Sequence, residues 1–383
     1  MQEPSGPVPF RFSWQELSGS LGDLGLFIPL VLAMTVAADL DIGIVLIMAG
    51  LMNVITGLVF RLPIPVQPMK AMAAVVIAES MLKDELFAAG IMLGIILLCM
   101  TRWIDWVNRC IPRFVVRGIQ FGIGVKLVLK ACEWLGGLSG WGWDSWSIAV
   151  IVGVVLLLMQ LYNKPGLVVV FGAGFLLLLC DQPQVYRELT VQFPEWQWTI
   201  PGWWAFKHGL YKGVLPQLPL TLLNSVVAVC ALSESYFPGR GVTPRKMTAS
   251  VGLMNLLAVP FGGIPMCHGA GGLAAHYRFG ARTGGSVIML GGLKILVGLL
   301  FGNALFQLLQ SYPISILGVM LVFAGGELMW SARRSLRSKR GAVVVLGTAA
   351  VIVWKNTFEG FLAGLVLAAV VHLVTGGNGN DES

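Results

Sequence analysis

The stretch Pro63-Ile64-Pro65-Val66-Gln67-Pro68-Met69-Lys70 interrupts an apolar chain and decides how the rest of it can fold. Its prolines favour an extended backbone, and Pro68 suits the first position of a new helix with Gln67 as its cap. A second interruption, Ile264-Pro265-Met266-Cys267-His268-Gly269-Ala270-Gly271-Gly272, lies in the second half of the chain. The segments that follow, near 68–80 and 268–279, are too short to cross a bilayer alone. We therefore predict two half-helices, each entered by a short extended segment.

The sequence around these two stretches is apolar enough to lie in lipid. Of the 383 residues, 56% are hydrophobic and only 12% are charged, about half the charged fraction of a soluble domain. This composition predicts an all-α polytopic membrane protein with twelve full spans beside the two half-helices. The predicted spans are 14–37, 42–60, 86–104, 110–133, 147–163, 165–181, 210–235, 246–262, 283–303, 312–330, 341–355 and 357–375.

An internal repeat relates the two halves of the chain. Gly50-Leu51-Met52-Asn53 recurs as Gly252-Leu253-Met254-Asn255, an offset of 202 that also brings Pro63 onto Pro265. The recurring asparagines, Asn53 and Asn255, are interpreted as ties that hold the half-helices. Because each half holds an odd number of segments, seven, the halves must lie upside down relative to one another. This is the 7+7 inverted-repeat transporter plan, in which the substrate binds near the midplane.

A second pair of motifs supports the repeat and sets its boundaries. Leu21–Leu26 resembles Leu215–Leu220, which pairs Asp23 with Gln217. We divide the chain into an N-terminal segment at 1–13, a first inverted repeat at 14–181, an interfacial connector at 182–209, a second inverted repeat at 210–375 and a C-terminal tail at 376–383. This division leaves no soluble regulatory domain.

The charged residues indicate orientation and partners. The net charge is +7, but the basic residues gather in short loops, most densely at 333–340, as the positive-inside rule predicts for cytoplasmic loops. This places the N- and C-termini in the cytoplasm and argues for a lipid bilayer, and against nucleic acid, as the partner. Without a cleavable signal segment, a prokaryotic cytoplasmic membrane is the predicted location. The scattered six cysteines and four histidines predict no metal site and no cofactor.

Two half-helix starts that face each other would form an anion site, because each offers free N–H groups and a partial positive charge. Lys70 adds a full positive charge inside the membrane, where a lysine is costly and marks function. Its structural alternative is a pair with Asp23 or Glu79. Asp23 has two open roles, a carrier of a coupling proton or a counter-charge for Lys70. The predicted substrate-binding residues are Gln67, Pro68, Met69, Lys70, Cys267, His268, Gly269, Ala270, Gly271, Gln217, Thr221 and Asn224.

The same stretches resemble the hallmark motifs of the molybdate transporter family, which is distantly similar to the SulP-type sulfate permeases. The resemblance is carried by 19–25, 65–70, Leu218–Ser225 and 265–273, and continues through 277–282. It implies a secondary active transporter that imports molybdate, with tungstate as an analogue, and a fold like that of the sulfate permeases.

Other functions remain open at this point. A sulfate or other oxyanion transporter would use the same fold, since sulfate shares the shape and charge of molybdate. An anion channel would need a continuous polar pore in place of a midplane trap. A membrane redox enzyme ranks far behind, because no paired histidines lie on neighbouring spans, and we predict that the protein is not an enzyme. Proton coupling and a homodimer are further expectations. Glu327 and Lys294, each isolated in a predicted span, receive no assigned role.

Overall fold

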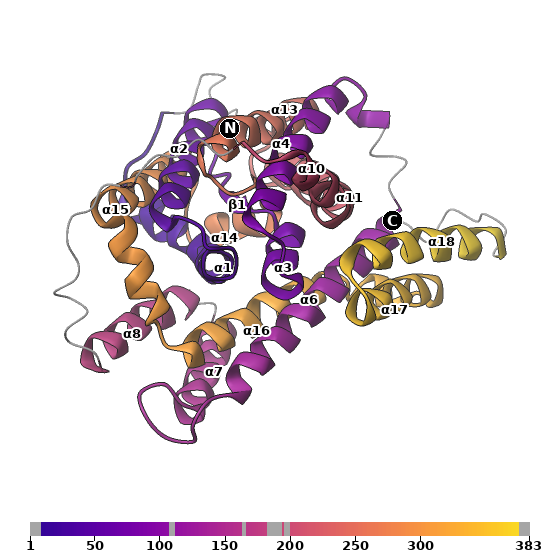
Figure 1. The fold of residues 1–383 in the computed structure, drawn as a ribbon. Coiled ribbons are helices and arrows are strands. Elements are labelled where there is room, and N and C mark those ends of the chain that lie inside the picture. The colour runs from indigo at the N-terminus through magenta and orange to yellow at the C-terminus, as the bar shows by residue number, and fades with distance from the viewer. Residues whose placement is uncertain (1–8, 107–111, 163–165, 182–193, 195–199, 375–383) are drawn as a thin grey trace.

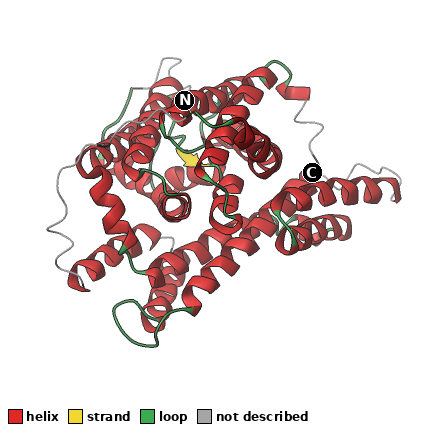
Figure 2. Ribbon diagram, in the orientation of Figure 1, coloured by secondary structure: helices red, strands yellow, loops and turns green. Residues whose placement is uncertain are grey.

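The computed structural model describes residues 9–106, 112–162, 166–181, 194 and 200–374, except for the side chains of 22, 23, 25, 26, 167, 168, 303, 305–307, 309 and 310. It is mostly helical (Figure 2). In the first half the elements are α1 (Trp14–Ala38), α2 (Ile42–Phe60), β1 (Val66–Pro68), α3 (Lys70–Glu79), α4 (Lys83–Met100), α6 (Arg113–Gly136), α7 (Trp146–Leu161) and α8 (Gly166–Asp181).

The second half begins with one continuous helical rod made of α10 (Trp203–Gly209), η1 (Leu210–Val214), α11 (Leu215–Leu220), η2 (Thr221–Val227) and α12 (Ala228–Tyr236). After it come α13 (Pro244–Ala258), η3 (Val259–Phe261), β2 (Met266–His268), α14 (Ala270–Arg278), α15 (Gly285–Gln310), α16 (Ile314–Ser331), η4 (Ser335–Arg337), α17 (Lys339–Trp354) and α18 (Thr357–Val374). The predicted segments match these helices closely, because long apolar runs fix helices in a chain with few charges.

The two extended segments meet in a two-stranded antiparallel sheet enclosed by helices (Figure 2). Val66 pairs with His268, Gln67 with Cys267 and Pro68 with Met266. Just beyond β1, the Met69 N–H donates to the carbonyl oxygen of Pro265 at 3.0 Å. The sheet therefore sets the starts of α3 and α14 side by side and pointing in opposite directions along their strands.

Asn53 and Asn255 hold the two strands in matching ways, as predicted. Asn53 Oδ1 accepts from the Val66 N–H at 2.8 Å, and Asn255 Oδ1 accepts from the Met266 N–H at 2.9 Å. The amide of Asn255 also donates to the Met266 carbonyl at 2.7 Å. The Asn53–Val66 bond spans 13 residues and the Asn255–Met266 bond spans 11.

The first half therefore carries two extra residues between its asparagine and its strand. The structural counterpart of Pro265 is Pro65, and the alignment of Pro63 with Pro265 is wrong.

Two further predictions, the start of α3 and the length of the connector, need correction. Pro68 does not begin α3: it ends β1, Met69 is the N-cap, and the helix begins at Lys70. Pairing with Met266 keeps Pro68 extended, which sequence alone cannot show. The connector predicted at 182–209 is also too long, because the second-half rod already begins at Trp203. Residues 182–193 and 195–199 of that connector lie outside the described residues.

Close helix crossings rely on pairs of glycines that face one another. A Cβ on Gly50 of α2 would lie 2.6 Å from the carbonyl oxygen of Gly291 of α15, and one on Gly291 would lie 2.5 Å from that of Gly50. Gly94 of α4 and Gly252 of α13 are reciprocal in the same way, at 3.0 Å each. The α2–α15 and α4–α13 pairs thus pack backbone against backbone, as small residues allow in membrane proteins.

The helices form two groups (Figure 1). One contains α1 to α4 and the elements from α10 to α15, built around the sheet. In the other, the long helices α6 and α16 cross, with α7 and α8 packed beside α16 and with α17 and α18 packed against α6. At the crossing, Gly124 and Gly325 are again reciprocal, at 2.5 and 2.6 Å. Contacts of α3 with α6 and of α1 with α16 join the two groups.

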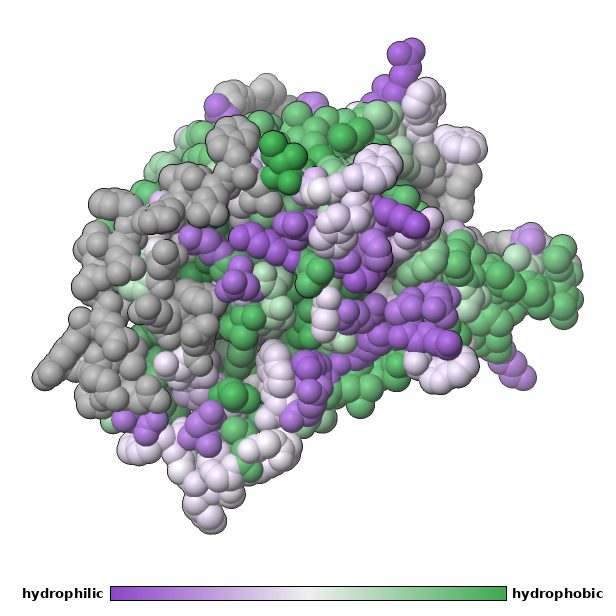
Figure 3. Space-filling model, in the orientation of Figure 1, coloured by the Kyte–Doolittle hydropathy of each residue, from purple (hydrophilic) through white to green (hydrophobic). Residues whose placement is uncertain are grey.

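The outer surface is suited to lipid. Within the described residues, five helices are long and apolar enough to cross a membrane, and shorter apolar helices accompany them. α18 has a mean hydropathy of 1.9 with only 17% of that segment buried, and Val366, Val370 and Leu373 on it are exposed. Figure 3 shows the corresponding apolar surface where α17 and α18 lie. An unpartnered apolar face of this extent indicates contact with lipid.

Candidate functional site

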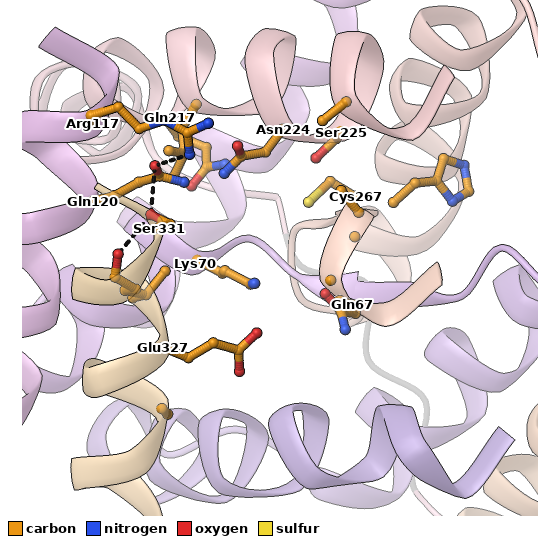
Figure 4. A pocket seen from close by; sticks show the side chains of 18 residues that line it. Gln67, Lys70, Arg117, Gln120, Gln217, Asn224, Ser225, Cys267, Glu327 and Ser331 are labelled. Atoms are coloured by element: carbon orange, nitrogen blue, oxygen red, sulfur yellow. Dashed lines mark hydrogen bonds between the residues drawn. The ribbon is translucent and has the colours of Figure 1, made fainter. Parts of the chain in front are cut away.

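A cavity of about 230 Å³ lies where the sheet and both half-helix starts face the α6–α16 pair (Figure 4). Its walls come from β1, α3, α6, the second-half rod, β2, α14 and α16. The predicted site residues that line it are Gln67, Lys70, Gln217, Asn224, Cys267, His268, Gly269, Ala270 and Gly271. Pro68, Met69 and Thr221 were also predicted but do not line it.

The start of α14 is open to the cavity. Its first backbone N–H groups, on Ala270, Gly271 and Gly272, have no acceptor in the part of the chain that the structure describes. Gly269 precedes them, and a Cβ there would lie 1.9 Å from Gln67 Oε1. A side chain at this position would require the end of the Gln67 side chain to move. Three free N–H groups at a helix start form a site for an anion.

The start of α3 differs, which the repeat did not predict. Gln217 Oε1 accepts from the N–H groups of Ala71, at 2.9 Å, and of Met72, at 3.3 Å. The amide nitrogen of Gln217 in turn donates to Thr221 Oγ1 at 2.9 Å. Gln217 therefore caps α3, and Thr221 positions Gln217. The two helix starts are unequal: α14 offers its backbone to a ligand, whereas α3 offers mainly the side chain of Lys70.

Lys70 points into the cavity (Figure 4). It is not paired with Glu79, because Glu79 Oε1 instead accepts from Lys126 Nζ at 2.6 Å and from the Thr357 N–H at 2.9 Å. Lys70 forms no ion pair with any side chain that the structure describes. The other structural alternative, a pair with Asp23, concerns a side chain outside the described residues. A cation thus faces the open start of α14.

His268 has no ring nitrogen left for a ligand. Nδ1 lies 3.3 Å from the carbonyl oxygen of Pro65, and Nε2 lies 2.9 Å from Ser250 Oγ. A carbonyl can only accept, so we assign the proton to Nδ1, and the Ser250 hydroxyl then donates to Nε2. The ring also packs edge-on against Phe60. A direct role of the His268 ring in binding is therefore not supported. The ring instead links β2 to Pro65, just before β1, and to Ser250 of α13.

Polar side chains on the second-half rod complete the wall. Asn224, predicted from sequence, and Ser225, which was not, face the cavity beside Cys267 (Figure 4). Both can donate hydrogen bonds to an oxygen ligand.

Sequence reasoning missed the contributions of α6 and α16. Arg117 Nη1 donates to Gln120 Oε1 at 2.9 Å, and Ser331 Oγ donates to the same oxygen at 2.9 Å. Glu327 reaches the cavity from α16. The sequence did contain a signal for these contributions, because Glu327 and Arg117 are ionisable residues inside predicted spans. The same signal misleads at Lys294, whose Nζ lies 3.4 Å from the centroid of the Phe27 ring and which does not line the cavity.

No cluster of His, Cys, Asp or Glu with the makings of a metal site occurs among the described residues. The cavity instead combines a helix start, two cations, the single carboxylate of Glu327 and neutral hydrogen-bond donors. This arrangement suits a small anion with several acceptor oxygens.

Comparison with known proteins places the chain among transporters. The profile of a family described as "Molybdate transporter of MFS superfamily" matches residues 15–127 and 209–328. Molybdate transporter 1 of Arabidopsis thaliana is 35% identical over 98% of this chain and 91% of its own. Molybdate transporter 2 of the same plant is 36% identical over 94% and 88%. Molybdate transporter 1 of Chlamydomonas reinhardtii is 32% identical over 94% and 92%.

Solved structures share the fold at low identity. The transmembrane domain of the cyanobacterial bicarbonate transporter BicA matches with a TM-score of 0.66 at 16% identity, covering 94% of this chain and 98% of that domain. The murine anion transporter Slc26a9, in an inward-facing state, matches with a TM-score of 0.68 at 13% identity, covering 96% and 69%. The mostly helical chain therefore has a fold like that of these two transporters, in line with the resemblance to sulfate permeases.

Proposed function

This chain belongs to the molybdate transporter family, and from that premise we propose how its cavity binds molybdate and moves it across the membrane. Molybdate, a tetrahedral dianion, lies between the open start of α14 and the ammonium group of Lys70. The observation that carries this proposal is the set of free N–H groups on Ala270, Gly271 and Gly272 beside a cation.

The donors around the cavity match the four acceptor oxygens of the anion. One face of the tetrahedron is bound by the α14 backbone, and Lys70 contributes a charge-assisted hydrogen bond. Asn224 and Ser225 bind the remaining oxygens from the second-half rod. Gln217 and Thr221 act indirectly, because they hold α3 and hence Lys70 in place.

The proposed transport mechanism is alternating access between the two helix groups. Twelve spans and two half-helices form two inverted repeats, for which the reciprocal Gly50–Gly291 and Gly252–Gly94 crossings and the matching asparagine ties are the support. The second repeat then starts at Trp203. The group around the sheet carries the anion and rocks against the α6–α16 group, as one bundle of helices does against the other in such carriers.

Membrane and partners follow in part from the family. The protein is an integral membrane transporter, and the fold points to transport in preference to catalysis. The cytoplasmic placement of both termini, a prokaryotic cytoplasmic membrane and a homodimer stay predictions. The three relatives compared above come from a plant and an alga.

Substrate selectivity tests the proposal. We expect the purified protein to bind molybdate and tungstate about equally, and both more tightly than sulfate, because tungstate nearly matches molybdate in size and charge. Competition binding measures this order, and mass-detected uptake into proteoliposomes checks that the bound anion is carried. Displacement of molybdate by an equal concentration of sulfate would favour the rival sulfate transporter. Uptake that passes anions without saturation would favour the channel.

Asp23→Asn tests the sequence-based assignment of a coupling proton to Asp23. A neutral amide mimics a protonated acid, so the variant should bind molybdate and exchange bound for free anion. If Asp23 carries the coupling proton, the variant should lose accumulation driven by a pH gradient. If Asp23 only balances Lys70, the variant should instead be less stable or bind the dianion more tightly, with proton-driven uptake intact. Binding, exchange and gradient-driven uptake measured on one variant separate these outcomes.

A further inference from the structure

Glu327 is an acidic residue in a cavity that we propose binds an anion, so the two negative charges would repel each other. It projects from α16 into the cavity and is the only ionisable residue of that helix. A Cβ on Gly271 would lie 3.2 Å from Glu327 Oε1, so the carboxylate stands beside the open first turn of α14. No hydrogen-bond donor or cation among the described side chains pairs with it. The Glu327 side chain is exposed in this structure.

The charges around the cavity do not balance once molybdate enters. The ionisable side chains that line it are Lys70 on α3, Arg117 on α6, Glu327 on α16, and Cys267 and His268 on β2. With both His268 ring nitrogens bonded and the Cys267 thiol neutral, the described side chains leave one excess positive charge. A dianion would convert this into one excess negative charge in a space of about 230 Å³. Neutralising one acid removes that excess.

The helices packed against α16 offer few other acids for this purpose. α7 carries no ionisable residue, and α8 carries Cys180 and Asp181 only at its end. α6 contributes cations to this face. α1 also contacts α16, and the side chain of its Asp23 lies outside the described residues. Glu327 is the acid that the described structure places at the anion.

We propose that Glu327 takes up one proton when molybdate binds beside the start of α14 and releases it when the anion leaves. This inference rests on the proposed function and names the coupling group of the same site. In the empty site the carboxylate lies beside the start of α14. The arriving dianion repels it and makes the protonated form more favourable, so that in the loaded site the two cations balance the dianion and the acid is neutral. The oxygen–hydrogen bond formed at binding breaks at release, and no other reactant is consumed.

The sign of the pH dependence follows from the linkage. Because binding takes up a proton, molybdate affinity should rise as pH falls, by up to about tenfold per pH unit where Glu327 is ionised in the free protein. Glu327→Gln removes both the repulsion and the titration. The variant should bind molybdate at least as tightly as the wild type at high pH, with an affinity that no longer depends on pH in this range.

The test measures proton uptake directly. Molybdate is added to purified protein in weakly buffered detergent solution with a pH indicator dye, and bound anion is measured in parallel. The wild type should take up about one proton per molybdate, Glu327→Gln none, and Glu327→Asp an intermediate or equal amount. Glu133→Gln, at an exposed ion pair with Lys130, is the matched control and should behave as wild type. In proteoliposomes Glu327→Gln should keep exchange and lose gradient-driven accumulation.

The outcomes are distinct. Wild-type protein that binds molybdate without proton uptake overturns the proposal even if no variant folds. Unchanged proton uptake in Glu327→Gln would also overturn the proposal. If proton uptake is lost in Asp23→Asn instead, the proton is assigned to Asp23. Wild-type protein that binds no molybdate at all refutes the proposed function itself, which is a separate result.

Discussion

Replacing Lys70 with alanine is expected to weaken molybdate binding by about 1.5–3 kcal/mol, a loss of roughly tenfold to more than a hundredfold, the usual scale for a hydrogen bond to a charged group. The reason is geometric as well as electrostatic. Lys70 points into the cavity, and Glu79, its alternative ion-pair partner, is instead engaged by Lys126 and Thr357. Equilibrium binding to the purified variant, with its melting temperature as a folding check, gives the measurement.

Two controls sharpen this result. Lys70→Arg should restore only part of the affinity, because a planar fork does not replace the compact ammonium group. Lys130→Ala removes a lysine near the end of α6 that forms an exposed pair with Glu133, and such pairs contribute little. Full affinity in a folded Lys70→Ala variant would show that Lys70 is structural.

The second large effect is expected from a single methyl group at Gly291. Gly291→Ala would place a Cβ 2.5 Å from the carbonyl oxygen of Gly50, so α2 and α15 would have to separate along their crossing. Overpacking typically costs roughly 1–3 kcal/mol, and a backbone neighbour cannot rotate away, so we expect the upper end of that range or loss of folded protein. Thermal unfolding in detergent and yield after size-exclusion chromatography measure the effect.

The neighbouring residue is the matched control. A Cβ on Gly292 meets no atom within 4 Å, and alanine is a better helix former than glycine by up to about 1 kcal/mol. Gly292→Ala should therefore be neutral or slightly stabilising. Equal destabilisation by both substitutions would mean that helix packing at Gly50 and Gly291 is looser than described.

Much of this structure could be predicted from sequence because lipid restricts the choices. Uncharged apolar runs of about 20 residues have the length of a membrane-spanning helix, so α2 and α18 were found within a residue of their ends. Broken backbone at that depth must be paired inside the protein, which is why the two proline stretches were assigned to one site. The asparagine ties followed from their recurrence in both halves.

The parts that sequence missed depend on contacts between distant residues. Gln217 caps α3 although it lies 146 residues from Ala71 in the sequence, and no local sequence pattern predicts such a contact. The two extra residues between Asn53 and Val66 shift the proline alignment, although the motif upstream is identical. His268 has the residue type and position expected of a ligand, yet Ser250 and Pro65 occupy its ring. Glu327 looks isolated in sequence because its neighbour, Gly271, lies on another helix.

The pairing of β1 with β2 has a consequence for synthesis. Val66 leaves the ribosome about 200 residues before its partner His268, which at roughly 5–20 residues per second corresponds to roughly 10–40 s. During that interval half of the future sheet has open backbone groups at a depth where each costs several kcal/mol if it faces hydrocarbon. We therefore expect the nascent first half to be held by the insertion machinery, and pausing of the ribosome before Met266 to increase degradation of the newly made chain.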